Sequence, residues 1–322
     1  MVLVRIPASS ANLGPGFDCL GLALNLYNYI EIKETDKPLS ITLGGKYREG
    51  IPQDETNLVY RAATQLWQRA DFQPAGISLH LINNIPPARG LGSSSAAIVG
   101  GLYAGNLIAG SPFNQAQLLD LAASIEGHPD NVAPALCGGA TIAVQEPSGG
   151  CLFHSLGNLP GLKMVVAVPS MLLSTYLARS LLPPQVPFTD AVWNLGRTGL
   201  LVTALLTQDY SLLKSAMQDK LHEQYRAKAI PGMSEALAAA NRAGALGAVL
   251  SGAGPTLIAF IPSEADETPV GNALRSAFEH NGVQAELHYL KPDCGGTVQL
   301  DEIPAEQLIL SGGGTHGSLK AL

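Results

Sequence analysis

The stretch PPARGLGSSSAAIVGG, residues 86–101, places several glycines and three consecutive serines after an alternating apolar run. That run, GISLHLINNI, is typical of a strand, and AAIVGGLYAGNLIA, which follows the serines, is typical of a helix buried on most sides. Gly90 and Gly92 permit a tight turn, and the serines at 93–95 are suited to begin a helix. A strand, a glycine turn and a helix start leave several N–H groups pointing at one spot, so the stretch predicts an anion site.

The usual phosphate-binding signatures do not fit this stretch. GxxxxGK[ST] is absent, and a dinucleotide GxGxxG would need glycine where Ser95 stands. Taken alone, residues 86–101 have a second interpretation that fits as well as an anion site. In it, the glycines serve only a turn and close helix packing. Further motifs are therefore needed to support phosphate binding.

Composition excludes several classes of protein. At 322 residues, with 46% hydrophobic and 14% charged residues, the chain is long enough for one or two buried cores. A net charge of −7 argues against a general nucleic-acid or anionic-membrane surface. We find neither a signal peptide at the start nor an apolar run flanked as a membrane helix. Four scattered cysteines without a CxxC pair indicate reduced thiols, so we expect a cytoplasmic protein without nucleic-acid or membrane partners.

The expected strands and helices alternate, but without the regularity of a doubly wound parallel sheet, so α+β is the predicted class. We expect helices over 55–70 with Thr56 as N-cap, after Gly92, over 113–126 with Gly127 as its C-cap, and over 130–139. A second half begins near residue 161, after a polar segment. It is expected to hold strands near 161–170, 247–252, 256–262 and 284–290, and helices over 190–206, 210–225, 233–243 and 269–282. The predicted organisation is an N-terminal domain 1–160, a C-terminal domain 161–300 and a tail 301–322.

A second motif is PASSANLGPGFDCLGLALNLYN, residues 7–28, in which Gly14 and Gly16 precede Asp18. A carboxylate next to such an apolar run is costly unless it meets a cation. The alternative is an ordinary turn aspartate that caps nearby N–H groups.

A third motif, IEGHPDN, places Glu126 at the end of a predicted helix, where the helix dipole disfavours an anion. A metal ion or an arginine would compensate its charge, and a solvated glutamate is the alternative. His128 and Asn131 follow closely and can donate to a ligand, although a lone histidine is more often structural. A fourth motif, SGAGPT between two apolar strands at 246–260, either closes over a ligand or packs against the other half.

Together these stretches resemble the GHMP kinase superfamily, with a first motif of the type PxxxNLGxGFD, a phosphate loop PxxxGLGSSxA and a GxGPT-like loop. SANLGPGFDCLGLAL, EGHPDNVAPALCGG, TYLARSLLP and DKLHEQYR look most like the homoserine kinase family. The resemblance runs from about Val4 to about His288. It implies two α+β domains, the first of the ribosomal-protein-S5 second-domain type and the second ferredoxin-like, with the active site between them.

The resemblance implies transfer of the γ-phosphoryl group of ATP to the side-chain hydroxyl of L-homoserine, giving O-phospho-L-homoserine on the route to threonine. The implied cofactors are ATP and Mg²⁺. Ser94 and Glu126 would ligate Mg²⁺, a hard cation that prefers oxygen donors. The ion would compensate the negative charge of Glu126 at the end of its helix. The residues implied to wrap the phosphates are Pro86, Pro87, Ala88, Arg89, Gly90, Leu91, Gly92, Ser93, Ser94, Ser95 and Ala96.

The resemblance also assigns the substrate's two charged groups. Asp18, with Asn12, would hold the ammonium, which exchanges charge for charge. Arg179 and Arg226 would hold the carboxylate, because a guanidinium matches it with two parallel hydrogen bonds. For either arginine taken alone, a surface salt bridge is the more common role.

Three residues are assigned to the reacting end of the substrate. Asn131 and His128 would contact the hydroxyl end, and Thr175 would support the transferring phosphate. With Arg179, Asn131 and Thr175 form the predicted catalytic set. If the substrate ammonium neutralises Asp18, the basicity of that carboxylate falls, so we expect catalysis by alignment and charge neutralisation without a strong side-chain base.

Two alternatives remain open. A mevalonate or shikimate type of GHMP kinase would share the phosphate loop, but those substrates carry a carboxylate and no ammonium. A catalytically silent regulatory relative would have no need of the metal site at Ser94 and Glu126. Base rates for soluble enzymes favour a homodimer.

Overall fold

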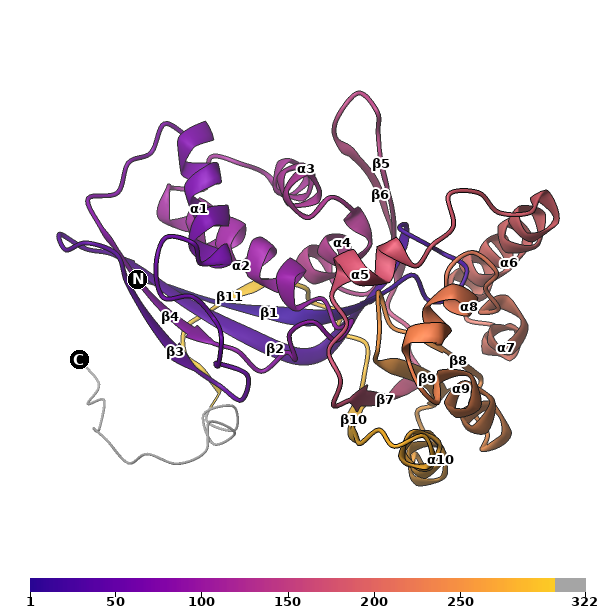
Figure 1. Cartoon of the computed structure of the whole chain (residues 1–322). Coiled ribbons are helices and arrows are strands. Elements are labelled where there is room, and N and C mark those ends of the chain that lie inside the picture. Colours follow the sequence, from indigo (N-terminus) through magenta and orange to yellow (C-terminus); the bar gives the residue numbers. More distant parts are fainter. Residues whose placement is uncertain (305–322) are drawn as a thin grey trace.

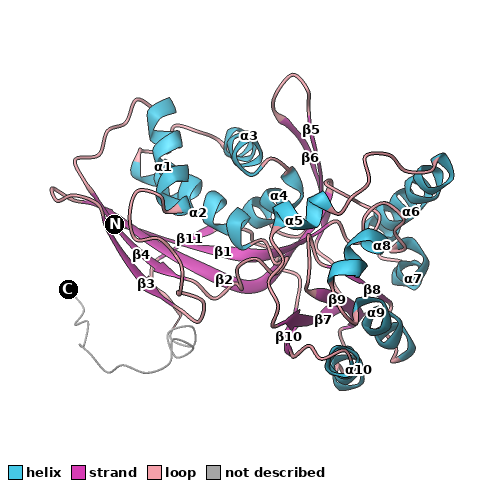
Figure 2. Ribbon diagram, in the orientation of Figure 1, coloured by secondary structure: helices cyan, strands magenta, loops and turns pink. Residues whose placement is uncertain are grey.

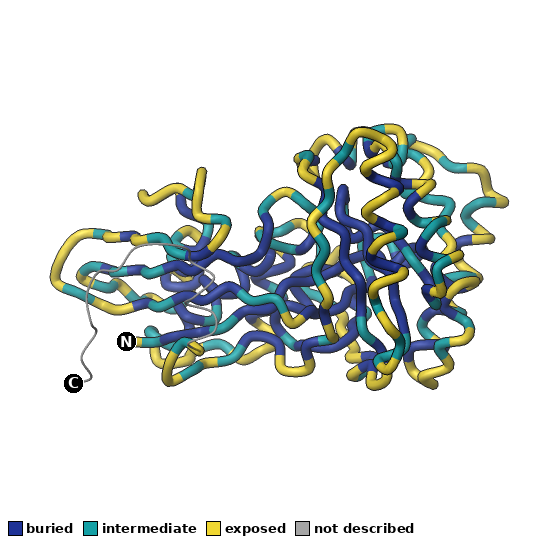
Figure 3. Tube along the Cα trace, turned by 90° about the horizontal axis from the view of Figure 1, so that it is seen from below, coloured by how far each residue is buried: buried dark blue, intermediate teal, exposed yellow. Residues whose placement is uncertain are grey.

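The computed structural model of the chain describes residues 1–304, so most of the predicted tail lies outside the described residues. Two β-sheets lie side by side, each with helices packed against it (Figure 1). The α+β class predicted from the sequence is confirmed. Figure 3 shows buried chain running through the middle of the molecule and exposed residues in the surrounding loops.

The first sheet has the strand order β11-β1-β2-β4-β3, with β5 pairing β2 and β6 pairing β5. Only β3 and β4 are parallel; β11 returns from the end of the described chain to pair with Leu3, Val4 and Arg5 of β1. A register shift between Pro7 and Ala8 interrupts the pairing of β1 with β2. The bounds are β1 Val2–Ala11, β2 Leu20–Glu34, β3 Ser40–Gly44, β4 Ile77–Ile82, β5 Ala140–Gln145, β6 Cys151–Gly157 and β11 Val298–Leu300.

Four helices cover one face of this sheet (Figure 2): α1 Leu58–Arg69, α2 Ser93–Ile108, α3 Gln115–Glu126 and α4 Pro129–Cys137. The expectation that Thr56 caps the first helix is wrong. Asn57 is the N-cap, because its side chain accepts hydrogen bonds from Val59 N and Tyr60 N, whereas Thr56 bonds Asp54. Gly127 ends α3 in the left-handed conformation, as the sequence indicated.

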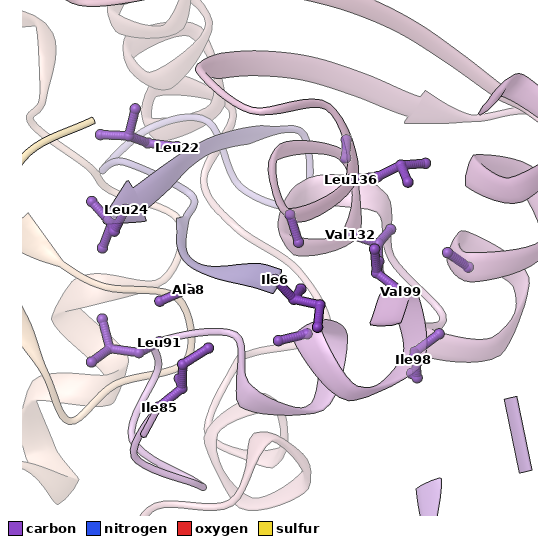
Figure 4. Close-up of a cluster of buried hydrophobic side chains, with 14 of the residues drawn as sticks. Ile6, Ala8, Leu22, Leu24, Ile85, Leu91, Ile98, Val99, Val132 and Leu136 are labelled. Atoms are coloured by element: carbon purple, nitrogen blue, oxygen red, sulfur yellow. The ribbon is translucent and has the colours of Figure 1, made fainter. Parts of the chain in front are cut away.

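The first core lies between these helices and the sheet (Figure 4). Ile6 of β1, Val99 of α2 and Val132 of α4 are buried there. The small residues of α2 let neighbouring chain approach closely: a Cβ added at Gly101 would lie 2.4 Å from Val59 O of α1. This close packing accounts for part of the glycine content of residues 86–101, as the packing interpretation required.

The second sheet is antiparallel, with the order β10-β7-β9-β8. Along the chain, this domain has a strand, helices, two strands, a helix and a strand. This element order and the strand order of the sheet are those of a ferredoxin-like domain. The bounds are β7 Leu162–Pro169, α5 Thr175–Ser180, α6 Phe188–Thr207, α7 Leu213–Ala216, α8 Glu223–Arg226, α9 Met233–Arg242, β8 Gly247–Leu250, β9 Leu257–Pro262, α10 Thr268–His280 and β10 Ala285–Leu290, with 3₁₀ turns at Tyr210–Leu212 and Ala227–Ala229.

The continuous helix predicted over 210–225 is wrong. The segment contains a 3₁₀ turn, α7 and then a turn before α8. Asp219 breaks it, because its carboxylate accepts hydrogen bonds from the N–H groups of Leu221, His222 and Glu223 and so starts a new helix. Sequence patterns also do not predict β6, β11 and α5. Within residues 1–304, no helix is long and apolar enough to cross a membrane.

Candidate active site

A cavity of about 420 Å³ lies where the two sheets meet, and all the predicted motifs contribute to its lining. Its wall includes Asp18 from the loop after β1, Ser94 from α2, His128 before α4, Thr175 at the start of α5 and Gly252 after β8. Segments far apart in the sequence therefore meet at one place.

The predicted phosphate loop connects β4 to α2. Gly90 and Gly92 have φ values of +78° and +68°, in the region that favours glycine. A Cβ at Gly92 would lie 2.1 Å from Ser9 Oγ, and one at Gly90 would lie 2.2 Å from Ser251 O. The glycines thus bring the start of α2 against both β1 and the loop after β8, with the helix N-terminus at the cavity wall.

Not every residue of 86–96 reaches the cavity. Leu91 is buried in the first core (Figure 4), and neither Pro86 nor Ser95 is among the lining residues. Arg89 lines the cavity, while its guanidinium donates to the carbonyl oxygens of Pro169 and Ser170 in the second domain. Its role includes holding the two domains together.

Glu126, the last residue of α3, accepts hydrogen bonds from two serine hydroxyls. Ser94 Oγ and Ser95 Oγ both lie 2.7 Å from Glu126 Oε1. The structure therefore brings the two predicted metal ligands, Ser94 and Glu126, together and adds Ser95. The serine donors partly offset the unfavourable end of the α3 dipole.

Asp18 and Arg179 form an ion pair with two hydrogen bonds, with distances of 2.7 Å and 2.9 Å. Asn12 Oδ1 accepts from the backbone N–H of Asp18 and so orients this loop. The hydrogen bonds to Asp18 raise the pKa of Arg179 despite its partial burial. The two residues predicted to bind opposite ends of the substrate thus neutralise each other here.

Arg226 is buried, with 2% exposure, and lines the cavity. Burial lowers its pKa to about 10, and the like charge of Arg179 adds to the effect. It donates to the carbonyl oxygens of Ala178 and Gly252, and within residues 1–304 it forms no ion pair. The surface salt-bridge alternative therefore does not apply to Arg226. A buried guanidinium bonded only to neutral acceptors attracts an anion.

His128, Asp130 and Asn131 form the cavity wall at the start of α4. His128 Nδ1 lies 2.6 Å from Asp130 Oδ1, and Asn131 Oδ1 accepts from Ser9 Oγ at 2.9 Å. Burial acts to lower the pKa of His128, but the hydrogen bond and charge of Asp130 outweigh it and raise that pKa. Asp130 was missed by sequence reasoning, although its place between two predicted residues was a signal.

Another part of the cavity wall combines apolar and amide side chains that sequence reasoning did not identify. Tyr29, Ile30, Leu58, Val59 and Ile82 line it together with Asn28, Asn57 and Asn83. Asn28 ends the stretch 7–28, but no local motif marks the other residues. They come from β2, from the end of β4 and from the start of α1, and they share only their place in the fold.

The sequence model of the GHMP kinase N-terminal domain matches residues 57–139, and that of the C-terminal domain matches residues 201–280. The chain is 48% identical to a homoserine kinase of Desulfitobacterium hafniense over 92% of this chain and 99% of the relative. It is 44% identical to one of Moorella thermoacetica with the same coverage.

Solved structures with a similar fold are also GHMP kinases. A homoserine kinase structure from Cytophaga hutchinsonii superposes with a TM-score of 0.85 at 31% identity, over 93% of this chain and 97% of that one. A mevalonate kinase of L. major, in complex with R-mevalonate, shares the fold with a TM-score of 0.69 at 15% identity, over 89% of this chain and 95% of that one.

The fold and the two matched domains define a GHMP kinase. Within that superfamily, the identity and coverage of its relatives show that the chain belongs to the homoserine kinase family.

Proposed function

We propose that this chain transfers the γ-phosphoryl group of ATP to the side-chain hydroxyl of L-homoserine, forming O-phospho-L-homoserine in the cytoplasm on the route to threonine. The observation that carries the proposal is the joint lining of one cavity by a glycine-bounded helix start, a serine–glutamate cluster and an Asp–Arg pair beside a buried arginine. The helix start and the serine–glutamate cluster suit a metal-bound polyphosphate. The Asp–Arg pair and the buried arginine suit an amino acid.

The nucleotide is assigned to the side of the cavity formed by α2 and β2. The N-terminus of α2 faces the phosphates, for which helix dipoles and free N–H groups are favourable. The lining residues Tyr29, Ile30 and Val59, with neighbouring amides, suit a purine base. Residues 87–90, 92–94 and 96 contact the triphosphate.

Ser94 and Glu126 fit a Mg²⁺ ion. Both present oxygen atoms at the cavity wall, close enough to hydrogen-bond each other at 2.7 Å, and Mg²⁺ prefers one or two protein oxygens with phosphate and water completing its shell. When bound, the ion would neutralise charge on the phosphates. Glu126 supplies the negative charge that holds it there.

The substrate ammonium is assigned to Asp18 and Asn12, and its carboxylate to Arg179 and Arg226. A zwitterion can replace the Asp18–Arg179 pair with two new ion pairs, so no charge is left without a partner. A ligand with a carboxylate alone would engage Arg179 and leave Asp18 uncompensated. This difference favours an amino acid over mevalonate or shikimate.

The reacting hydroxyl is assigned to Asn131 and His128. Ser9 fixes Asn131 and Asp130 fixes His128, so both side chains are oriented before the substrate arrives. Thr175, at the first position of α5, lines the cavity and supports the transferring phosphate. Alignment and charge neutralisation account for the transfer without a strong base.

A coupled ADP-release assay tests the proposal, with Mg-ATP and L-homoserine beside mevalonate, shikimate and no acceptor. We expect turnover with L-homoserine alone. Turnover with another alcohol would overturn the substrate assignment, and ATP binding without turnover of any acceptor would support a silent relative. Sedimentation of the same sample tests the homodimer that base rates favour.

A further inference from the structure

We propose that His222 is a positioning residue, which fixes the guanidinium of Arg226 for the substrate carboxylate and links it to the loop that carries Asp18. The inference rests on the proposed function, in which Arg226 binds that carboxylate. His222 lies in the turn before α8, is fully buried and does not line the cavity. It would act on the substrate only through Arg226.

The hydrogen bonds of His222 determine its tautomer. Nε2 lies 2.8 Å from the carbonyl oxygen of Gly14, which can only accept, so Nε2 carries the hydrogen. Nδ1 lies 3.2 Å from Arg226 NH1, which can only donate, so Nδ1 presents its lone pair. The ring is therefore neutral, with one nitrogen donating and the other accepting, and burial lowers its pKa in agreement.

Arg226 depends on His222 for its only side-chain acceptor within residues 1–304. Its two other hydrogen bonds go to the backbone oxygens of Ala178 in α5 and Gly252 after β8. Three acceptors from three separate segments thus set the plane and direction of the guanidinium. Of the three acceptors, only the side chain of His222 can be removed by a substitution. Its hydrogen bond to Gly14 O connects Arg226 to the loop that carries Asp18.

The ring of His222 is itself held in place. Asp219 accepts from the N–H of His222 at 2.8 Å and fixes the turn, and the ring of Phe17 lies 5.2 Å from the imidazole. The charged groups near the imidazole are Asp219, whose Oδ2 lies 3.8 Å from Nε2, and Arg226 and Asp18. The orientation of Nδ1 toward Arg226 is therefore present before any ligand binds.

Two substitutions separate positioning from simple core packing. Glutamine can donate from its amide nitrogen toward Gly14 O and accept at its amide oxygen from Arg226, whereas leucine fills the space with neither group. We expect His222→Leu to raise the KM for L-homoserine about tenfold, the effect of losing one hydrogen bond to a charged group. The KM for ATP should change less than about twofold, and His222→Gln should recover most of the loss.

A double-mutant cycle with Arg226→Met tests whether the effect passes through Arg226. In the Arg226→Met background, His222→Leu should raise the KM for L-homoserine no further. If the two effects multiply in full, or if His222→Leu alone keeps the wild-type KM, the inference is overturned. Equal effects on the KM values of ATP and L-homoserine would also overturn it.

His222→Phe serves if the leucine variant does not fold, because phenylalanine keeps an aromatic ring beside Phe17 but offers neither a hydrogen to Gly14 O nor a lone pair to Arg226. It should raise the KM for L-homoserine as leucine does, and a wild-type KM in His222→Phe would overturn the inference. The wild-type assay is run first. A wild-type enzyme inactive on L-homoserine overturns the proposed function, whereas an active enzyme with unchanged KM in the variants overturns only the role of His222.

Discussion

Asp18 and Arg179, 161 residues apart in the sequence, neutralise each other through two hydrogen bonds at the wall of the cavity. Each is assigned to one charged group of the substrate, so binding exchanges one internal ion pair for two external ones. The carboxylate and the guanidinium are both about one-third exposed, at 36% and 37%, so water can reach the pair while it exchanges. The site therefore has no unneutralised carboxylate at Asp18 before the substrate enters.

Asp18→Asn should raise the KM for L-homoserine about tenfold to a hundredfold, because it removes the charge that holds the ammonium and frees Arg179 from its partner. The kcat and the KM for ATP should change little. Steady-state kinetics with each substrate varied gives the result. Asp209→Asn is the matched control, because within residues 1–304 the carboxylate of Asp209 bonds only the hydroxyl of Ser211. A collapse of kcat with unchanged KM would instead assign Asp18 to the chemical step.

Glu126→Gln should raise the Mg²⁺ concentration needed for half-maximal activity about tenfold or more, because a neutral amide holds the ion less strongly than a carboxylate. Ser94→Ala should act in the same direction. Ser95→Ala is the comparison, since Ser95 bonds Glu126 but does not line the cavity. A Mg²⁺ titration at fixed ATP measures all three, and an unshifted curve for Glu126→Gln would contradict its assignment as a ligand.

Gly92→Ala should lower kcat/KM for ATP at least about tenfold. The added Cβ would lie 2.1 Å from Ser9 Oγ and 3.0 Å from Asn131 Oδ1, and the φ of +68° is strained for alanine, so the start of α2 must move. Gly199→Ala, in helix α6, is the control. Among residues 1–304, no atom outside the neighbouring turns of that helix lies within 4 Å of a Cβ added there. Gly199→Ala should keep full activity and gain a little stability from the helix propensity of alanine. Wild-type kinetics in Gly92→Ala would show that the loop tolerates a side chain.

Glu223→Gln should stabilise the protein at alkaline pH. Burial raises the pKa of Glu223 from 4.5 to about 8, so the folded state binds its proton more tightly than the unfolded state does. Stability from this group is complete below pH 4.5 and is lost as the pH rises through about 8. The unfolding temperature of Glu223→Gln minus that of wild type should therefore increase from pH 5 to pH 8.5. Glu279→Gln, on the exposed face of α10, is the matched control for the removal of one carboxylate.

Local signals in the sequence were enough to predict the loops of the site. Gly90, Gly92 and Gly127 adopt the left-handed conformations that their places at turns and helix ends indicated. Contacts between distant segments carried no local signal. The pairing of Asp18 with Arg179, the bond from Asp130 to His128 and the apolar wall at Tyr29 all depend on how the sheets and helices pack, which no short pattern encodes.

The errors in the elements have related causes. The segment 210–225 has helical residues, but the carboxylate of Asp219 competes for backbone N–H groups and divides it. Strands β6 and β11 lie at edges of the first sheet, and among their residues only Leu156 is buried, so no alternating buried run marks them. In β6, even Leu152 and Phe153 are exposed. The polar, glycine-rich residues around this strand resemble a loop in composition.

Strand β11 also determines how the chain can be shortened. The pairing of Val298–Leu300 covers the outer edge of β1 at Leu3, Val4 and Arg5. The same strand carries Ser9, which donates to Asn131 of the cavity wall. A chain ending near Leu290 would keep both matched family domains but would expose the backbone donors and acceptors of that edge to other molecules. Such a fragment would leave β1 open to pairing with another chain, so a usable expression boundary lies beyond Leu300.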